Sequence, residues 1–136
     1  MFNRRISSNR GLFKRFNYKI MYENRGPFLE NVAMRWLKTK GLKVVAREYI
    51  SSAGGIDLIM LDDSTLCFID VIYRGSQDIG NIGYNISTSE KKKMIQTASS
   101  FVNHQYKYLD HPKRFDALFI EPGIDEPYEM NWVKNI

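Results

Sequence analysis

The chain of 136 residues has one cysteine and two histidines, and each scarcity excludes a class of protein. A single cysteine, Cys67, cannot form an internal disulfide, and a free thiol in an apolar run suits a reducing compartment. His104 and His111 have no ligand-type spacing, so we assign them no metal. No apolar run approaches the roughly 18 residues that a membrane span needs, and nothing resembles a secretory signal. We therefore expect a cytoplasmic protein that has no membrane partner.

Hydrophobic residues make up 43% of the chain, which indicates a globular domain with its own core. The net charge of +5 is unevenly placed, because residues 1–25 hold seven Lys and Arg against one Glu. That segment carries +6, so the remaining residues sum to −1. We interpret residues 1–24 as a basic, flexible arm and residues 25–136 as a single domain. The arm suits phosphate contacts through Arg4, Arg5, Lys14 and Arg15. A solvated tail, sequence upstream of the true start, or a transit peptide are the alternatives.

Two apolar runs, Ile56–Leu61 and Leu66–Tyr73, are each of strand length and are separated by the turn-forming residues 62–64. Neither run alternates cleanly with polar residues, which predicts central strands of a sheet covered by helices. Each run nevertheless contains one acid, Asp57 or Asp70. A buried carboxylate needs a partner, a metal or a proton. Two acids on neighbouring strands therefore predict half of a site for a hard divalent cation, Mg²⁺ or Mn²⁺.

The position two residues after Asp70 is informative, because side chains at that spacing share one face of a strand. A large group of nucleases, with the pattern D…(D/E)-x-K, has a lysine there beside its metal ligands. This chain has Ile72, which neither carries a charge nor donates a hydrogen bond. The metal half of the pattern is present and the lysine is missing.

A helix is expected to begin at Arg25-Gly26-Pro27 and to end at Gly41, since proline is tolerated in a first turn. Its apolar face is made by residues at helical spacing, which are Phe28, Leu29, Val32, Ala33, Trp36 and Leu37. Glu30 falls beside this face. It either leans over the sheet edge toward the two aspartates, as a third metal ligand, or is a surface residue favoured by the helix dipole.

A first strand is expected over Lys43–Ile50, followed by a turn over Ser51–Gly55 that is better explained by a tight hairpin than by an approaching ligand. After Arg74 a polar loop runs to residue 87, either as a mobile segment over a cleft or as an ordinary connection. Later strands are expected over Arg114–Glu121 and Tyr128–Val133.

The second helix is expected to begin with the capping box Ser87–Glu90. Its buried stripe is predicted to be Met94, Ile95, Ala98, Phe101 and Val102. Lys91 projects near the middle of that stripe, so it is our candidate for the catalytic lysine that Ile72 replaces, with Arg74 as a further catalytic candidate. Lys92 and Lys93, together with Arg74, are candidate nucleic-acid contacts; a solvated lysine cluster is the alternative.

Five segments, in order from Gly26 onward, carry a family resemblance. They are Gly26 with Glu30, then GGIDLI, FIDVIYR, RFD at Arg114–Asp116, and NWVKN at Asn131–Asn135. Together they resemble the YraN-type family of small bacterial proteins. The resemblance implies a restriction-endonuclease-like α/β fold, close to archaeal Holliday-junction resolvases, with a mixed central sheet flanked by helices in the order α-β-β-β-α-β. It also implies a role with nucleic acid. Three positions depart from the family pattern, because Gly55 and Asp70 replace Glu, and Ile72 replaces Lys.

Three functions remain open. The chain is a metal-dependent endonuclease that uses Glu30, Asp57, Asp70 and Lys91, a nucleic-acid-binding protein on a degenerate nuclease fold, or a protein-interaction module. We favour the second, because Glu at 55 and Lys at 72 are both missing while the basic residues remain. DNA is the expected partner rather than RNA, and a homodimer is compatible with the sequence.

Overall fold

The structure is a computed structural model, and it describes residues 16–75 and 86–136. The elements are α1 (Phe16–Thr39), β1 (Lys43–Ser51), β2 (Gly54–Asp62), β3 (Thr65–Tyr73), α2 (Thr88–His104), the 3-10 helix η3 (Tyr106–Tyr108), β4 (Lys113–Pro122) and β5 (Tyr128–Val133). The basic residues predicted to contact phosphates from the arm, Arg4, Arg5, Lys14 and Arg15, lie outside the described residues. Most of the polar loop expected after Arg74 lies outside them as well.

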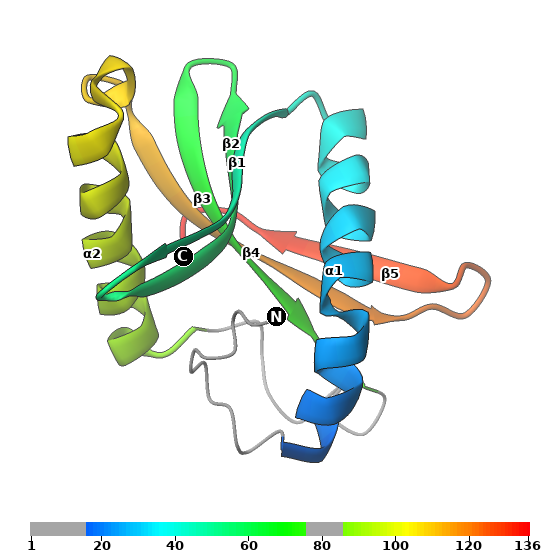
Figure 1. The fold of residues 1–136 in the computed structure, drawn as a ribbon. Coiled ribbons are helices and arrows are strands. Elements are labelled where there is room, and N and C mark those ends of the chain that lie inside the picture. The colour runs from blue at the N-terminus through cyan, green and yellow to red at the C-terminus, as the bar shows by residue number, and fades with distance from the viewer. Residues whose placement is uncertain (1–15, 76–85) are drawn as a thin grey trace.

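The strands form one mixed sheet in the spatial order β1-β2-β3-β4-β5. Neighbouring strands are antiparallel except for β3 and β4, which run parallel. A parallel pair needs a long crossover, and α2 supplies it on the way from β3 to β4 (Figure 1). The expected mixed sheet with flanking helices is confirmed, with β5 completing the order.

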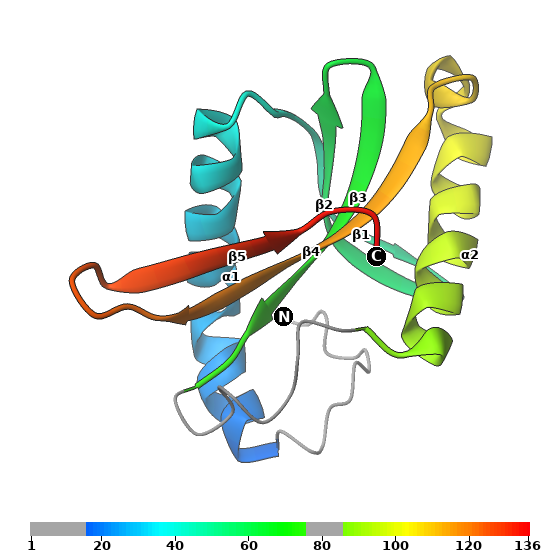
Figure 2. The ribbon, with the colours of Figure 1, turned by 180° about the vertical axis from the view of Figure 1, so that it is seen from behind.

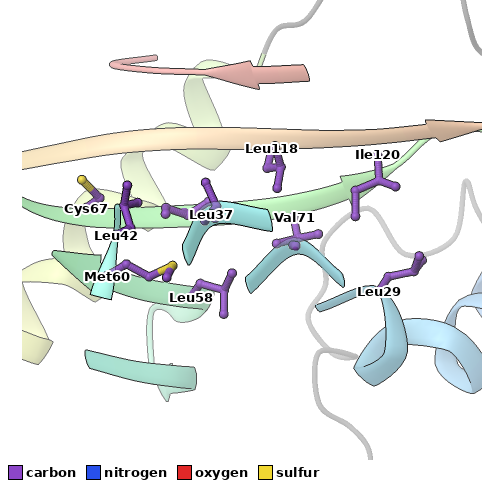
Figure 3. Packing of buried hydrophobic residues seen from close by; sticks show 11 residues of the cluster. Leu29, Leu37, Leu42, Leu58, Met60, Cys67, Val71, Leu118 and Ile120 are labelled. Atoms are coloured by element: carbon purple, nitrogen blue, oxygen red, sulfur yellow. The ribbon is translucent and has the colours of Figure 1, made fainter. Parts of the chain in front are cut away.

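Each face of the sheet is covered by one helix, as the two opposite views show (Figures 1 and 2). The first core cluster joins α1 to the sheet through Leu29, Ala33, Leu37, Leu42, Leu58, Met60, Cys67, Ile69, Val71, Leu118 and Ile120 (Figure 3). The second joins α2 to the other face through Ile56, Ile59, Leu66, Phe68, Met94, Ala98, Phe101 and Val102. Strands β2 and β3 are therefore buried on both faces, as their continuous apolar runs predicted.

The β1–β2 connection is the tight hairpin that the sequence favoured. The Ser51 hydroxyl accepts a hydrogen bond from the Ala53 N–H at 3.1 Å. Gly54 has a φ of +149°, a conformation that glycine adopts without strain. A Cβ at Gly54 would lie 3.7 Å from Thr97 Oγ1, so the backbone that the glycine exposes approaches α2 of its own chain.

Two expectations about α1 and α2 are wrong. Helix α1 begins at Phe16, with Pro27 inside it, and not at the expected residues 25–27. Proline at residue 27 removes one intrahelical hydrogen bond and suits a first turn, which is why the sequence indicated a start there. In α2, Ile95 is 49% exposed, whereas Thr97 is fully buried. Thr97 meets the cost of burying a hydroxyl by donating to the Lys93 carbonyl at 2.8 Å.

The start of α2 and the end of α1 follow their sequence signals. The Ser87 hydroxyl accepts the Glu90 N–H at 3.1 Å, which confirms the predicted N-cap. After α1, Gly41 has a φ of +97° and its N–H donates to the Lys38 carbonyl at 3.0 Å. Within residues 16–75 and 86–136, no helix has the length and apolarity to cross a membrane.

Candidate functional site

Asp57 and Asp70 lie side by side on neighbouring strands, as the two apolar runs predicted. The ladder between β2 and β3 ends at the pair Leu58 and Ile69, and Asp57 and Asp70 are the next residues on the two strands. Asp57 is buried, and its Oδ2 accepts the Val71 N–H at 2.7 Å. The carboxylate of Asp57 therefore bonds to the main chain of β3 at the residue directly after Asp70.

Ile72 shares a face with Asp70, because the alternate residues Ile69 and Val71 belong to the core cluster beneath α1. The two residues thus belong to the face away from α1, and both are half-buried. In the parallel ladder Ile72 pairs with Phe119 of β4. The position at which the nuclease pattern has its lysine is occupied by an apolar side chain, and its partner in the ladder is a phenylalanine.

Glu30 is 2% exposed, so it is not the surface glutamate that one interpretation of the sequence suggested. Its neighbour Leu29 belongs to the same core cluster as Val71 and Ile120 (Figure 3). The burial favours an internal role for Glu30, and its role as a third metal ligand stays a prediction.

The three acids offer the oxygen ligands that Mg²⁺ or Mn²⁺ prefers, but their arrangement does not form a metal cage. Among the described residues, no three His, Cys, Asp or Glu side chains lie close enough together to hold a metal ion. One oxygen of Asp57 is already bonded to the Val71 N–H. The metal site stays a prediction, and we derive no catalytic step through it.

The lysines of α2 lie in its first turns. Lys91 is half-buried, whereas Lys92 and Lys93 are exposed. The catalytic role of Lys91 stays a prediction, and the two exposed lysines lie at the surface, where an anion can reach them.

Arg74 lies on the same face of β3 as Asp70 and Ile72, but it is only 7% exposed. Its Nη2 lies 2.8 Å from Glu121 Oε2, and its Nε also donates to that oxygen, at 3.2 Å. The guanidinium lies over the Phe119 ring, 5.1 Å from its centroid. The other oxygen of Glu121 accepts the Asn131 amide at 2.9 Å. A role for Arg74 in phosphate contact or catalysis stays a prediction, and it would act from within this internal network.

A second buried network surrounds Asp116, which is 0% exposed. Asp116 Oδ1 accepts Arg114 Nε at 2.9 Å and the Asn135 N–H at 2.9 Å. Its Oδ2 accepts Arg114 Nη2 and Trp132 Nε1, each at 3.0 Å. Arg114 Nη2 also reaches Asp62 at the end of β2, at 3.0 Å. One carboxylate therefore ties together β4, β5, the C-terminal residues and, through Arg114, the β2–β3 turn.

This network was missed in the sequence, although its residues belong to the RFD and NWVKN segments. The signal was present, because Arg114 and Asp116 are two apart on a strand and so share a face. Hydrogen bonds to Asp116 are the main cause that raises the pKa of the Arg114 guanidinium above its ordinary value. Burial, and then the negative charge of Asp116, raise the pKa of the neighbouring Cys67 thiol to about 11. The thiol is thus neutral and unreactive at physiological pH.

A mixed five-stranded sheet with one helix on each face, and with an acid pair on β2 and β3, defines a restriction-endonuclease-like α/β protein. The chain belongs to the uncharacterised protein family UPF0102, whose model matches residues 29–120. It is 30% identical over 115 residues to a UPF0102 protein of Pseudomonas syringae pv. syringae, covering 83% of this chain and 92% of the relative. It is 32% identical over 113 residues to one of Alcanivorax borkumensis, covering 83% and 90%. The family resemblance of the motifs is thereby confirmed.

Proposed function

We propose that the protein binds nucleic acid, DNA rather than RNA, on a nuclease-like fold whose catalytic set is incomplete. The observation that carries the proposal is Ile72, half-buried on the face of Asp70 and paired in the ladder with Phe119. Phosphodiester hydrolysis needs positive charge where the oxyanion develops, and isoleucine supplies none. Loss of one such group costs roughly 10²–10³-fold in rate.

The basic residues supply the binding part of the proposal. Lys92 and Lys93 are exposed in the first turns of α2, next to a half-buried Lys91. The whole chain carries +5, and all of this net positive charge comes from residues 1–25, because the remaining residues sum to −1. Such charge attracts the phosphate backbone without reading the bases, and the affinity falls with salt. A cytoplasmic location is part of the same proposal, since the one thiol is free and buried.

Binding is tested by fluorescence anisotropy with labelled linear and branched DNA over a range of salt concentrations. Lys92→Ala with Lys93→Ala is expected to lower the slope of log K against log[salt] by about 1.8, if each lysine contacts one phosphate of duplex DNA. The matched control is Lys107→Ala, an exposed lysine on η3 at the other end of α2. Absence of binding by the wild type at low salt would refute the proposal.

Cleavage is measured on the same substrates with Mg²⁺ and with Mn²⁺. We expect little or no turnover by the wild type. The alternative is an active Mg²⁺-dependent endonuclease in which Lys91 has taken over the lysine role, and the half-burial of Lys91 favours it. Robust wild-type cleavage that Lys91→Ala abolishes would establish that alternative. A protein-interaction module remains if neither binding nor cleavage is observed.

A further inference from the structure

Two tryptophans meet on the surface at the end of α1 and the end of β5. The rings of Trp36 and Trp132 pack edge to face, with centroids 6.1 Å apart and planes at 82°. Both residues are half-buried, and both pack against the core cluster beneath α1. We call Trp36, Lys40, Arg114, Trp132 and Lys134 the tryptophan ledge. The ledge shares no residue with the acid pair or with the lysines of α2.

Each ring of the ledge carries a cation. Lys40 Nζ lies 4.8 Å from the Trp36 ring centroid, and Lys134 Nζ lies 4.4 Å from the Trp132 ring centroid. Arg114 Cζ lies 5.9 Å from Trp132 and is fixed by Asp116. Lys40 and Lys134 are exposed, and among the described residues neither forms an ion pair. One lysine ammonium group therefore lies over each of the two tryptophan rings.

We infer that the tryptophan ledge is a second contact surface for nucleic acid, of the kind that takes a single strand. A single strand alternates flat bases with phosphates. The ledge offers the complementary set, aromatic rings on which bases stack and ammonium groups that meet phosphates. An acidic peptide would use the lysines but not the rings. The inference rests on the proposed nucleic-acid binding. It adds the surface on which a single nucleic-acid strand lies and the groups of that strand, bases and phosphates, that the protein contacts.

The chain is suited to a direct test, because its only two tryptophans are both in the ledge. Their intrinsic fluorescence therefore reports on this surface alone. Titration of the full chain with an oligothymidylate is expected to quench the fluorescence and to shield both rings from acrylamide. Lys40→Ala and Lys134→Ala are each expected to lower the salt slope of single-strand binding by about 0.7. Lys107→Ala is the matched control, since Lys107 lies over the Tyr108 ring, at 5.2 Å, outside the ledge.

Trp36→Leu tests stacking separately from charge. It keeps an apolar side chain on the core and removes one ring, so single-strand affinity is expected to fall about fivefold or more. The Lys40→Ala and Lys134→Ala variants are expected to keep the melting temperature of the wild type. They therefore test the tryptophan ledge even if Trp36→Leu fails to fold.

The inference and the proposed function can fail separately. Anisotropy that shows DNA binding, with unchanged tryptophan fluorescence and with Lys134→Ala equal to Lys107→Ala, would overturn the ledge and leave the proposed function standing. Polyglutamate that quenches as strongly as the oligonucleotide at equal salt would also overturn it, in favour of a general anion surface. No binding of any nucleic acid would remove both.

Discussion

Asp116 offers the sharpest test of what holds this fold together. Replacing it with alanine removes one carboxylate that accepts hydrogen bonds from Arg114, from Trp132 Nε1 and from the Asn135 N–H. Arg114 is 19% exposed in its side chain, so its charge would lose its buried partner and keep only Asp62. Trp132 and Asn135 would lose their hydrogen bonds to the Asp116 side chain, while the backbone ladder between β4 and β5 would remain.

The size of the effect follows from burial. Breaking a buried ion pair by removing one partner costs about 3–5 kcal/mol, because the remaining charge is left uncompensated. Each donor left without an acceptor adds about 1–3 kcal/mol when it stays buried. Local rearrangement will hydrate part of this site, so these costs do not add in full. We expect Asp116→Ala to lower the free energy of unfolding by about 3–5 kcal/mol, against the roughly 5–15 kcal/mol that domains possess.

The measurement is urea unfolding followed by circular dichroism. The matched control is Asp62→Ala, because Asp62 bonds to the same Arg114 Nη2 at 3.0 Å but is 26% exposed in its side chain. A pair so open to water contributes at most about 1 kcal/mol. If Asp116→Ala cost no more than Asp62→Ala, with the same dependence on urea concentration, Asp116 would not be the centre of the network.

Two further predictions follow from the core and from the acid pair. Burial raises the pKa of Cys67 to about 11 from its ordinary value of 9.0, so the folded state retains a proton that the unfolded state loses. Stability should therefore fall as pH rises from about 9 to 11, and Cys67→Ala should flatten that decline in thermal melts; an equal decline in the variant would contradict the assignment. Ile72→Lys with Gly55→Glu should restore some DNA cleavage with Mn²⁺, because it supplies the lysine and the glutamate that the family pattern has. The chain has room for the glutamate, since a Cβ at Gly55 meets only Tyr49 O at 3.4 Å and Ile50 Cγ1 at 3.7 Å. No cleavage by a folded double variant would mean that more than these two groups is missing.

The strands of the sheet could be predicted from the sequence because burial on both faces leaves a continuous apolar run. Continuous apolar runs at residues 56–61 and 66–73 indicated two buried strands. The structure extends the first by two residues at its start and one at its end, and the second by one residue at its start. Periodicity is less decisive on a helix. Ile95 fits the apolar spacing of α2 but is exposed, whereas Thr97 is buried against the sheet. A threonine that bonds to its own helix is apolar enough to be buried, and composition alone does not reveal it.

The sequence predicted that Asp57 and Asp70 are neighbours, but it did not predict that Arg74 is buried. The turn between two strands fixes which residues stand across from each other, so Asp57 beside Asp70 followed from the sequence. The partner of Arg74 did not, because Glu121 is 47 residues away and meets it only through the parallel pairing of β3 and β4. An arginine that directly follows a strand looks exposed in a sequence until the strand on its far side is known.

The residues that carry the family resemblance fall into two groups. One group stabilises the fold, and the other occupies the positions of the nuclease pattern. Arg114, Asp116 and Trp132 are bonded to one another, so stability alone accounts for these hydrogen bonds. Asp70 and Ile72 lie on one face of β3, where the nuclease pattern has a lysine at position 72 and this chain has an isoleucine. The Asp116 network holds β4, β5 and the C-terminal residues together whatever occupies position 72. The fold therefore does not depend on a complete catalytic set, and this is why we propose binding rather than cleavage.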